Sequence, residues 1–489
     1  MELTLLLPQP DAARLQRLPF IKASRTGRTR STAMRIVWHD SLDRALAAQG
    51  LALSEQRGVW RLERHRPIST EPWPPATDHR VVLEADGLET MRETLAGDDS
   101  LVRPDALPDM LTPVAAFAGR QITSLVTIDT EPVTISVLDG VLRAVAAEQP
   151  ATRLVLNGPY QQVLSLLLAL SEAMPISIPP RSLAAEALNL ADGSPHVARR
   201  RGAPALPADG LTVQGAFAHI VGHLTDVMLQ LAPAIADATT GPEPVHQMRV
   251  AVRRARSAFA LFPAPPDSPC HARAAEGLKR LGQTLGPARD WDVFMTETAP
   301  PVEVVLPNQP PVHALLRAGA RQRRAARESL IAFMTGSEFR SLSLELAFLA
   351  AAELPETVPL GLNEFAAGVL RKRWRKVLHV GKALDDLDDP ALHGLRLKAK
   401  RLRYAAEFFA PLFPEKPAAR FIRRLAVLQE RLGQFNDTTV AEALLRDLGG
   451  KPGYAAGLIL GFTAARGVRA RPKISSAWSR FRRRDPFWE

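Results

Sequence analysis

The chain has 489 residues, of which 46% are hydrophobic and 23% are charged. This composition excludes a disordered or low-complexity protein, and the length predicts two or three domains. The single cysteine, Cys270, excludes an internal disulfide framework and a cysteine-rich zinc module, so a reducing compartment fits best.

The net charge of +11 is distributed unevenly along the chain. Residues 1–195 hold 19 basic and 23 acidic side chains, whereas residues 196–489 hold 43 and 28. A positive excess confined to one part of a chain predicts an anionic partner for that part. The first residues lack the features of a secretory signal, and the longest apolar stretches are shorter than the roughly 18 residues of a membrane span. We therefore predict a cytoplasmic protein without membrane association.

The first 190 residues combine strand and helix patterns. Short alternating or apolar runs predict strands of an antiparallel sheet at 3–7, 80–83, 122–128, 133–137 and 153–156. Helical patterns cover 10–17 and 161–173. Residues 191–210 contain three prolines and an arginine run, which is the composition of a linker.

From residue 211 onward the pattern is helical, and it repeats. The block around His246 returns 147 positions later around His393, and the same offset carries Leu285-Gly286 onto Leu432-Gly433 and Asp290 onto Asp437. A register kept over two separated blocks indicates an internal duplication. We expect two homologous helical halves, about 211–350 and 360–489, packed around a pseudo-twofold axis.

Each repeated block predicts a helix with a cationic stripe and an apolar face. In the first copy the stripe holds His246, Arg249, Arg253 and Arg256, and in the second it holds His393, Arg396, Lys400 and Arg403. No acidic residue lies within either block, so repulsion at i, i+3 and i+4 spacing disfavours the stripe unless an anion compensates. A single basic stripe is usually a solvated face, but its occurrence in both copies favours a binding site.

Further basic residues accompany these stripes and are candidates for the same site. They are Lys279, Arg280, Arg371, Arg375, Arg424 and Arg431. Near the end of the chain, residues 466–488 mix arginines with Trp478, Phe481, Phe487 and Trp488. Two interpretations remain for this tail: a cationic binding surface with aromatic anchors, or a helix docked by its aromatic side with its basic side in solvent.

Catalytic and metal-binding patterns are weak. His246 and His393 either pack between the halves or donate hydrogen bonds to phosphate. A metal is not predicted there, since the neighbouring arginines repel cations, and His219 and His223 lack an accompanying glutamate. Asp290 and Asp292 are interpreted as structural residues, as a helix cap or as partners of arginine. No cofactor is predicted.

The motifs of residues 211–489 resemble the CHAD domain, a conserved-histidine α-helical domain. The resemblance rests on both histidine blocks, on Leu285-Gly286 through Asp292, on residues 432–437 and on the terminal tryptophans. It implies two four-helix bundles around a basic central groove that binds inorganic polyphosphate. It also implies that the eight stripe residues contact phosphate. Ala251 stands where the second copy has Lys398, so the halves need not contribute equally.

Residues 1–190 resemble a degenerate CYTH domain, the triphosphate-tunnel β-barrel. That family begins with Glu-x-Glu-x-Lys, which holds metal and triphosphate, whereas this chain has Glu2-Leu3-Thr4-Leu5-Leu6. The family's later basic positions fall on residues 51–54, and its acidic positions fall on Thr152, Leu154 and Leu156. A tunnel without its carboxylates cannot assemble the metal that polarises a phosphoryl group.

The sequence thus predicts an α+β multidomain protein. An antiparallel β-barrel of residues 1–190 and a linker of residues 191–210 precede an all-α domain of two four-helix bundles. The predicted function is non-enzymatic binding of inorganic polyphosphate, in the cytoplasm or at polyphosphate granules. A CYTH-type inorganic triphosphatase is the alternative, and a nucleic-acid-binding protein is the further alternative.

Overall fold

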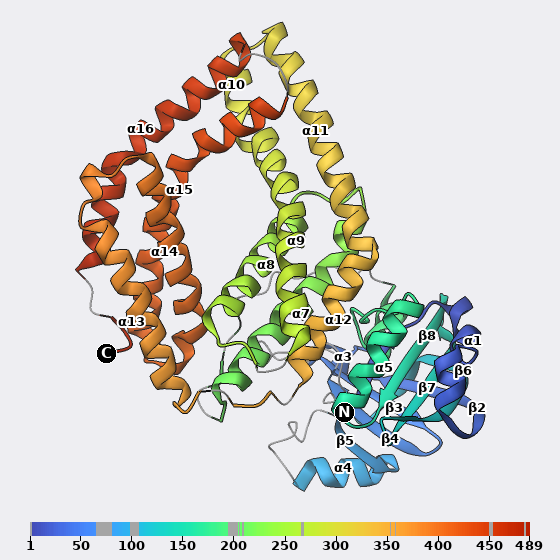
Figure 1. Ribbon diagram of the computed structural model, residues 1–489. Helices are drawn as coiled ribbons and strands as arrows, with labels where there is room; N and C mark the ends of the chain where they lie inside the picture. Colours follow the sequence, from blue (N-terminus) through green and yellow to red (C-terminus); the bar gives the residue numbers. More distant parts are fainter. Residues whose placement is uncertain are drawn as a thin grey trace. The chain divides into compact units, whose positions relative to one another are not determined.

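The computed structural model describes residues 2–64, 81–97, 107–193, 204, 206–207, 210–265, 268–352, 354–356, 358–448, 453–483 and 486–489. The chain divides into two compact units (Figure 1). The first contains residues 1–199 and 340–352, and the second contains residues 200–339 and 353–489. Most of the predicted linker lies outside the described residues. No helix in the described part combines the length and apolar character needed to cross a bilayer.

The first unit is built on an eight-stranded antiparallel sheet, in the order β1-β8-β7-β6-β2-β3-β4-β5. Its strands are β1 (Glu2–Leu6), β2 (Arg25–Asp40), β3 (Leu51–Gln56), β4 (Val59–Arg64), β5 (Val81–Asp86), β6 (Thr112–Ile128), β7 (Glu131–Ala144) and β8 (Glu148–Asn157). Among these strands β1 and β5 have one neighbour each. The predicted antiparallel β architecture is confirmed, but the described sheet is an open half-barrel, not a closed barrel.

Alternation along the strands gives this sheet one apolar face and one cavity-lining face. In β7 the side chains of Val133, Ile135 and Val137 are buried, while Thr134 and Ser136 line a cavity on the opposite face. The helices of the unit are α1 (Ala12–Leu15), α2 (Pro19–Ser24), α3 (Ala45–Ala48), α4 (Leu88–Gly97), α5 (Tyr160–Ala173) and α6 (Leu183–Asp192). Helix α6 packs against β2, β3, β6 and β7.

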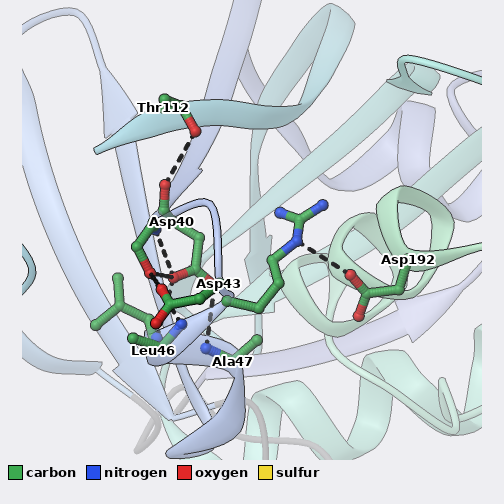
Figure 2. Close-up of polar contacts among 9 residues, drawn as sticks. Asp40, Asp43, Leu46, Ala47, Thr112 and Asp192 are labelled. Atoms are coloured by element: carbon green, nitrogen blue, oxygen red, sulfur yellow. Dashed lines mark hydrogen bonds and ion pairs between the residues drawn. The ribbon is translucent and has the colours of Figure 1, made fainter. Parts of the chain in front are cut away.

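A buried aspartate fixes the turn between β2 and α3, as Figure 2 shows. The Asp40 carboxylate is fully buried and accepts hydrogen bonds from the backbone N–H groups of Ser41, Leu46 and Ala47 at 2.8, 3.0 and 3.1 Å. Three such bonds satisfy a buried charge and the free amides of a helix start. Beside it, Arg44 pairs with Asp192 at the end of α6, which ties this turn to the helix.

The second unit is all-helical, and its helices form two sets that Figure 1 shows in green to yellow and in orange to red. The first set is α7 (Val213–Ala236), α8 (Glu243–Leu261), α9 (Pro269–Val293), α10 (Pro300–Val305) and α11 (Pro310–Thr335). The second is α13 (Leu362–Gly381), α14 (Asp389–Phe409), α15 (Glu415–Asp447) and α16 (Tyr454–Arg482). Helices α7, α8 and α9 pack in sequence, with α11 against α9 and α7, and α13 to α16 also pack in sequence.

Helices that are equivalent in the repeat also contact each other across the two sets. Helix α8 packs on α14, α7 on α13 and α9 on α15, which are the contacts that halves related by an approximate twofold axis make. The predicted apolar faces are buried: Met248 and Val252 of α8 and Leu395 and Leu402 of α14 are at most 1% exposed. The duplication read from the sequence therefore explains both the packing and the placement of the two stripes.

Helix α12 (Ser337–Ala351) stands apart from both sets, because residues 340–352 belong to the first compact unit. Residues 342–349 are all buried, and the Phe348 ring lies 4.4 Å from that of Tyr160 in α5. The chain therefore returns to the first unit between the two halves of the repeat.

The C-terminal aromatic residues form a core rather than a binding surface. Trp478, Phe481, Phe487 and Trp488 are all buried, and Phe481 and Trp488 contact the Trp374 ring of α13. The neighbouring arginines of α16 point to solvent. Of the two interpretations of the tail, the docked helix with a solvated basic side is the one observed.

Candidate functional site

The two cationic stripes meet in one cavity of about 570 Å³, here called the central cavity. It lies between α8, α9, α14 and α15 and receives His246, Arg249, Arg253 and Arg256 from α8 and His393, Arg396 and Lys400 from α14. A π-helical turn, Phe294–Thr298, continues α9, and Phe294 and Thr298 also line the cavity. Because α8 and α14 pack on each other, residues 147 positions apart converge at this site.

A second cavity, of about 750 Å³, lies between α8, α13 and α14 and is here called the α13 cavity. Eight of its lining residues are Lys or Arg, and none is Asp or Glu. Those eight are Arg253, Arg256, Lys372, Arg373, Lys376, Lys398, Lys400 and Arg401. Without a carboxylate in the lining, the walls of this cavity repel one another unless an anion or solvent screens them.

A third cavity, of about 460 Å³, lies between α14 and α15 and is here called the α15 cavity. Its cations are Arg253, Arg396, Lys400, Arg403 and Arg423, and its carboxylate is Glu430. Arg253 and Lys400 line all three cavities. We call the three together the cationic groove, which thirteen different Lys and Arg residues and two carboxylates line.

The positive charge of the groove changes the ionisation of its own members. Burial and the neighbouring guanidinium groups of Arg253, Arg396 and Arg249 lower the pKa of Lys400 from 10.5 to about 7. Burial and Arg401 also lower the pKa of Arg373. Burial is the larger cause of both shifts, and the repulsion by neighbouring guanidinium groups adds to it.

The two aspartates of the α9 motif serve as partners of arginine. Asp290 accepts a 2.7 Å hydrogen bond from Nη1 of Arg249, and the buried Asp292 accepts one of 2.6 Å from Nε of Arg323. The structural interpretation of these aspartates is confirmed, although the arginine involved is not the adjacent Arg289. Asp437, the repeat counterpart of Asp290, belongs to residues 434–437, whose side chains lie outside the described part.

Six candidates from the sequence line none of the three cavities. Lys279 pairs with Glu276, Arg280 with Glu338, and Arg371 with Glu489. Arg424 donates to the backbone oxygen of Arg480, Arg431 lies 3.8 Å from Glu430, and Arg375 is exposed. The structure therefore brings together the eight stripe residues but not these six.

Helix α13 supplies three cavity cations that sequence reasoning did not choose. Lys372, Arg373 and Lys376 face the α13 cavity, whereas Arg371 and Arg375 on the same helix do not. Residues 369, 372, 373 and 376 share one side of a helix, and Trp374 and Val377 are buried on another. The spacing of the basic residues relative to the buried ones places them on two sides of the helix, but it does not select the side that borders the cavity.

Contacts between α8 and α14 hold the two stripes together. Arg254 and Arg403 both donate to Glu407, at 2.9 and 2.7 Å, and the Glu407 side chain is 9% exposed. The Arg253 guanidinium lies 5.8 Å from the centroid of the Tyr404 ring. These contacts fix two cations that would otherwise repel each other across the helix pair.

We expect Glu407→Ala to lower the free energy of unfolding by about 3 kcal/mol, because it leaves two half-buried guanidinium groups without their carboxylate. The measurement is the shift of the urea unfolding midpoint of the full chain. The control is Glu442→Ala, which breaks the exposed pair with Arg446 and should cost less than about 1 kcal/mol. Equal shifts for both variants would contradict the role assigned to Glu407.

The cavity of the first unit has a different electrostatic character. It measures about 560 Å³ and has three lining arginines, Arg57, Arg61 and Arg153, against three glutamates, Glu2, Glu63 and Glu84. Arg61 pairs with Glu84 at 2.7 Å, and the buried Arg153 pairs with Glu186 at 2.5 Å. This balance of charge offers no excess of cations to a polyanion.

One sequence assignment in this cavity was wrong. Glu2 and Thr4 of β1 do line it, but on β8 the lining residues are Arg153, Val155 and Asn157, not Thr152, Leu154 and Leu156. Leu154 and Leu156 are fully buried, on the other side of the strand. A period of two places neighbouring residues on opposite faces, so an offset of one residue exchanges the faces.

Comparison with known proteins assigns the helical region. Residues 214–446 match the family model described as the CHAD domain. This chain contains a CHAD domain. The crystal structure of the CHAD domain from the plant Ricinus communis is 28% identical, with a TM-score of 0.50, over 58% of this chain and 97% of that chain.

Other known proteins are also similar to part of this chain. PptA from Streptomyces chartreusis is 17% identical, with a TM-score of 0.43, over 55% of this chain and 100% of that chain. Two uncharacterized proteins of Mycobacterium tuberculosis, from strains CDC 1551 / Oshkosh and ATCC 25618 / H37Rv, are each 28% identical over 248 residues. The match covers 48% of this chain and 47% of each relative, so it spans about half of their length.

Proposed function

We propose that the chain binds inorganic polyphosphate in the cationic groove of its CHAD domain, without catalysing a reaction there. The observation that carries the proposal is the charge of the groove: thirteen Lys and Arg residues from helices α8, α9, α13, α14 and α15, with two carboxylates. The resemblance to the CHAD family points to the same ligand.

The groove suits a linear anion with a charge at every unit. Arg253 and Lys400 line all three cavities, so one chain can contact cations in neighbouring cavities without leaving the groove. Arginine binds phosphate oxygens through two parallel hydrogen bonds, and lysine acts as a point charge. His246 and His393 in the central cavity add hydrogen-bond donors beside these cations.

Nucleic acid fits the groove less well. Proteins that bind single strands stack the bases on aromatic side chains, but the aromatic residues that line the three cavities are Phe294 and Tyr404. Tyr404 is covered by the Arg253 guanidinium, and Phe294 is 1% exposed. Polyphosphate needs no such platform, because it has no bases.

We further infer that the first unit is a CYTH-like half-barrel that has lost its triphosphatase chemistry. Of the family's first motif, Glu2 and Thr4 line the cavity, which leaves one carboxylate where the family has two. Two of the three cavity arginines are held by glutamates. Among the residues that the structure describes, no three or more His, Cys, Asp or Glu side chains are grouped so that they could hold a metal ion, and a bound metal is what phosphoryl transfer at such a site uses.

Competition between the two polyanions tests the proposal on the full chain. We expect unlabelled long-chain polyphosphate to displace a fluorescent single-stranded DNA at a phosphate concentration about a hundredfold lower than DNA needs to displace polyphosphate. Tripolyphosphate, which carries far fewer charges per molecule, should compete weakly. Equal competition by DNA and polyphosphate per phosphate would favour the nucleic-acid function instead.

A further inference from the structure

Lys400 occupies the point where the parts of the groove join. Its side chain lines the central, α13 and α15 cavities, and the residue is partly buried on α14. In the described part of the chain, its electrostatic neighbours are the guanidinium groups of Arg253, Arg396 and Arg249. A primary amine in this position can give up its proton near neutral pH, whereas the arginines around it stay protonated.

The charged and titratable groups that line the same cavities come from every helix packed around Lys400. They are His246, Arg249, Arg253 and Arg256 of α8; Arg289 and Asp290 of α9; Lys372, Arg373 and Lys376 of α13; His393, Arg396, Lys398, Arg401 and Arg403 of α14; and Arg423 and Glu430 of α15. Asp290 is held by Arg249 and Glu430 lies beside Arg431. Positive charge therefore dominates the field at Lys400.

We propose that Lys400 couples polyanion binding to the uptake of one proton, so that the groove binds phosphate chains more tightly as the pH falls. This inference rests on the proposed function and adds a regulation to it. A phosphate chain placed between Lys400 and the arginines replaces their repulsion with attraction, which favours the ammonium form. In the bound protein Lys400 is then protonated, whereas in a fraction of the free protein it is not.

The direction of the effect follows from this linkage. In the free protein burial and the arginines lower the pKa of Lys400 to about 7, and a bound polyanion raises it again. The affinity is then highest below pH 7 and falls as the pH rises through 7 towards the pKa of the bound state. Between pH 7 and pH 9 we expect a loss of about tenfold or more.

Calorimetric titration of the full chain with long-chain inorganic polyphosphate, at pH 7, 8 and 9 and at fixed ionic strength, measures this loss. This range lies above the second ionisation of the terminal phosphates, at about pH 6. Repeating pH 8 in two buffers of different ionisation enthalpy counts the protons taken up, and we expect close to one per bound site.

Two variants and a control assign the proton to Lys400. Lys400→Arg keeps the charge at every pH, so its affinity at pH 7 and at pH 9 should be the same. Lys400→Met removes the charge, so its affinity should be low and independent of pH. Lys382→Arg, at the exposed end of α13, should show the same pH dependence as the native chain.

Each outcome has a distinct meaning. A native chain that binds equally at pH 7 and pH 9, or a Lys400→Arg variant that keeps the native pH dependence, overturns this inference and leaves the proposed function intact. Absence of polyphosphate binding at every pH overturns the proposed function itself.

Discussion

The double variant Arg253→Ala/Arg396→Ala is expected to bind long-chain polyphosphate about a hundredfold more weakly than the native chain. Arg253 lines all three cavities and Arg396 lines two. A hydrogen bond to a charged group contributes about 1.5–3 kcal/mol, and two of them at the lower end already amount to a factor of roughly 100. Calorimetry or fluorescence competition with the full chain measures the change.

The matched control is Lys279→Ala/Arg280→Ala, which also removes two positive charges from the CHAD domain. Lys279 and Arg280 pair with Glu276 and Glu338 on the surface and line none of the three cavities. We expect this control to change the affinity by less than about threefold, since distant surface charges are screened at physiological salt. If both double variants weaken binding equally, net charge and not the groove determines affinity.

Of the changes considered, a rise in salt concentration should lower the affinity for long-chain polyphosphate the most. A protein that neutralises 6–10 phosphates loses about 10³–10⁵ in affinity between 50 and 200 mM salt, because binding releases condensed counterions. Thirteen cations line the groove, so we expect a loss in this range for long-chain polyphosphate. The slope of log affinity against log salt concentration measures the number of contacts, and a slope near −1 would show that the groove engages only one or two phosphates.

The helical site was predictable because the same pattern of basic and apolar residues occurs in both halves of the repeat. His246 and His393 occupy equivalent positions of α8 and α14, and these two helices pack on each other, so the duplication alone predicts that the stripes converge. The apolar faces of α8 and α14 also predicted which side of each helix packs in the core, and Met248 and Leu395 on these faces are buried.

The choice between neighbouring faces was not predictable in the same way. Helix α13 carries basic residues on two sides of its buried face, and only the packing of α14 decides that Lys372 and Lys376, not Arg371 and Arg375, border the cavity. The same limit applies to β8, where Arg153 and Leu154 exchange faces with a shift of one residue. Strand β2 was missed because most of its 16 residues are exposed, so hydrophobic periodicity does not mark it.

The course of helix α12 bears on how the CHAD domain is to be studied in isolation. Leu342, Leu346, Phe348 and Leu349 are each at most 1% exposed, and they lie in the segment that clusters with the first unit. A fragment that begins near residue 211 would retain this helix but lose Tyr160 and the rest of its packing partners. We therefore expect such a truncation to expose the apolar side chains of α12 to solvent and to self-associate. Titrations of that fragment would then be misleading, whereas titrations of the full chain would not.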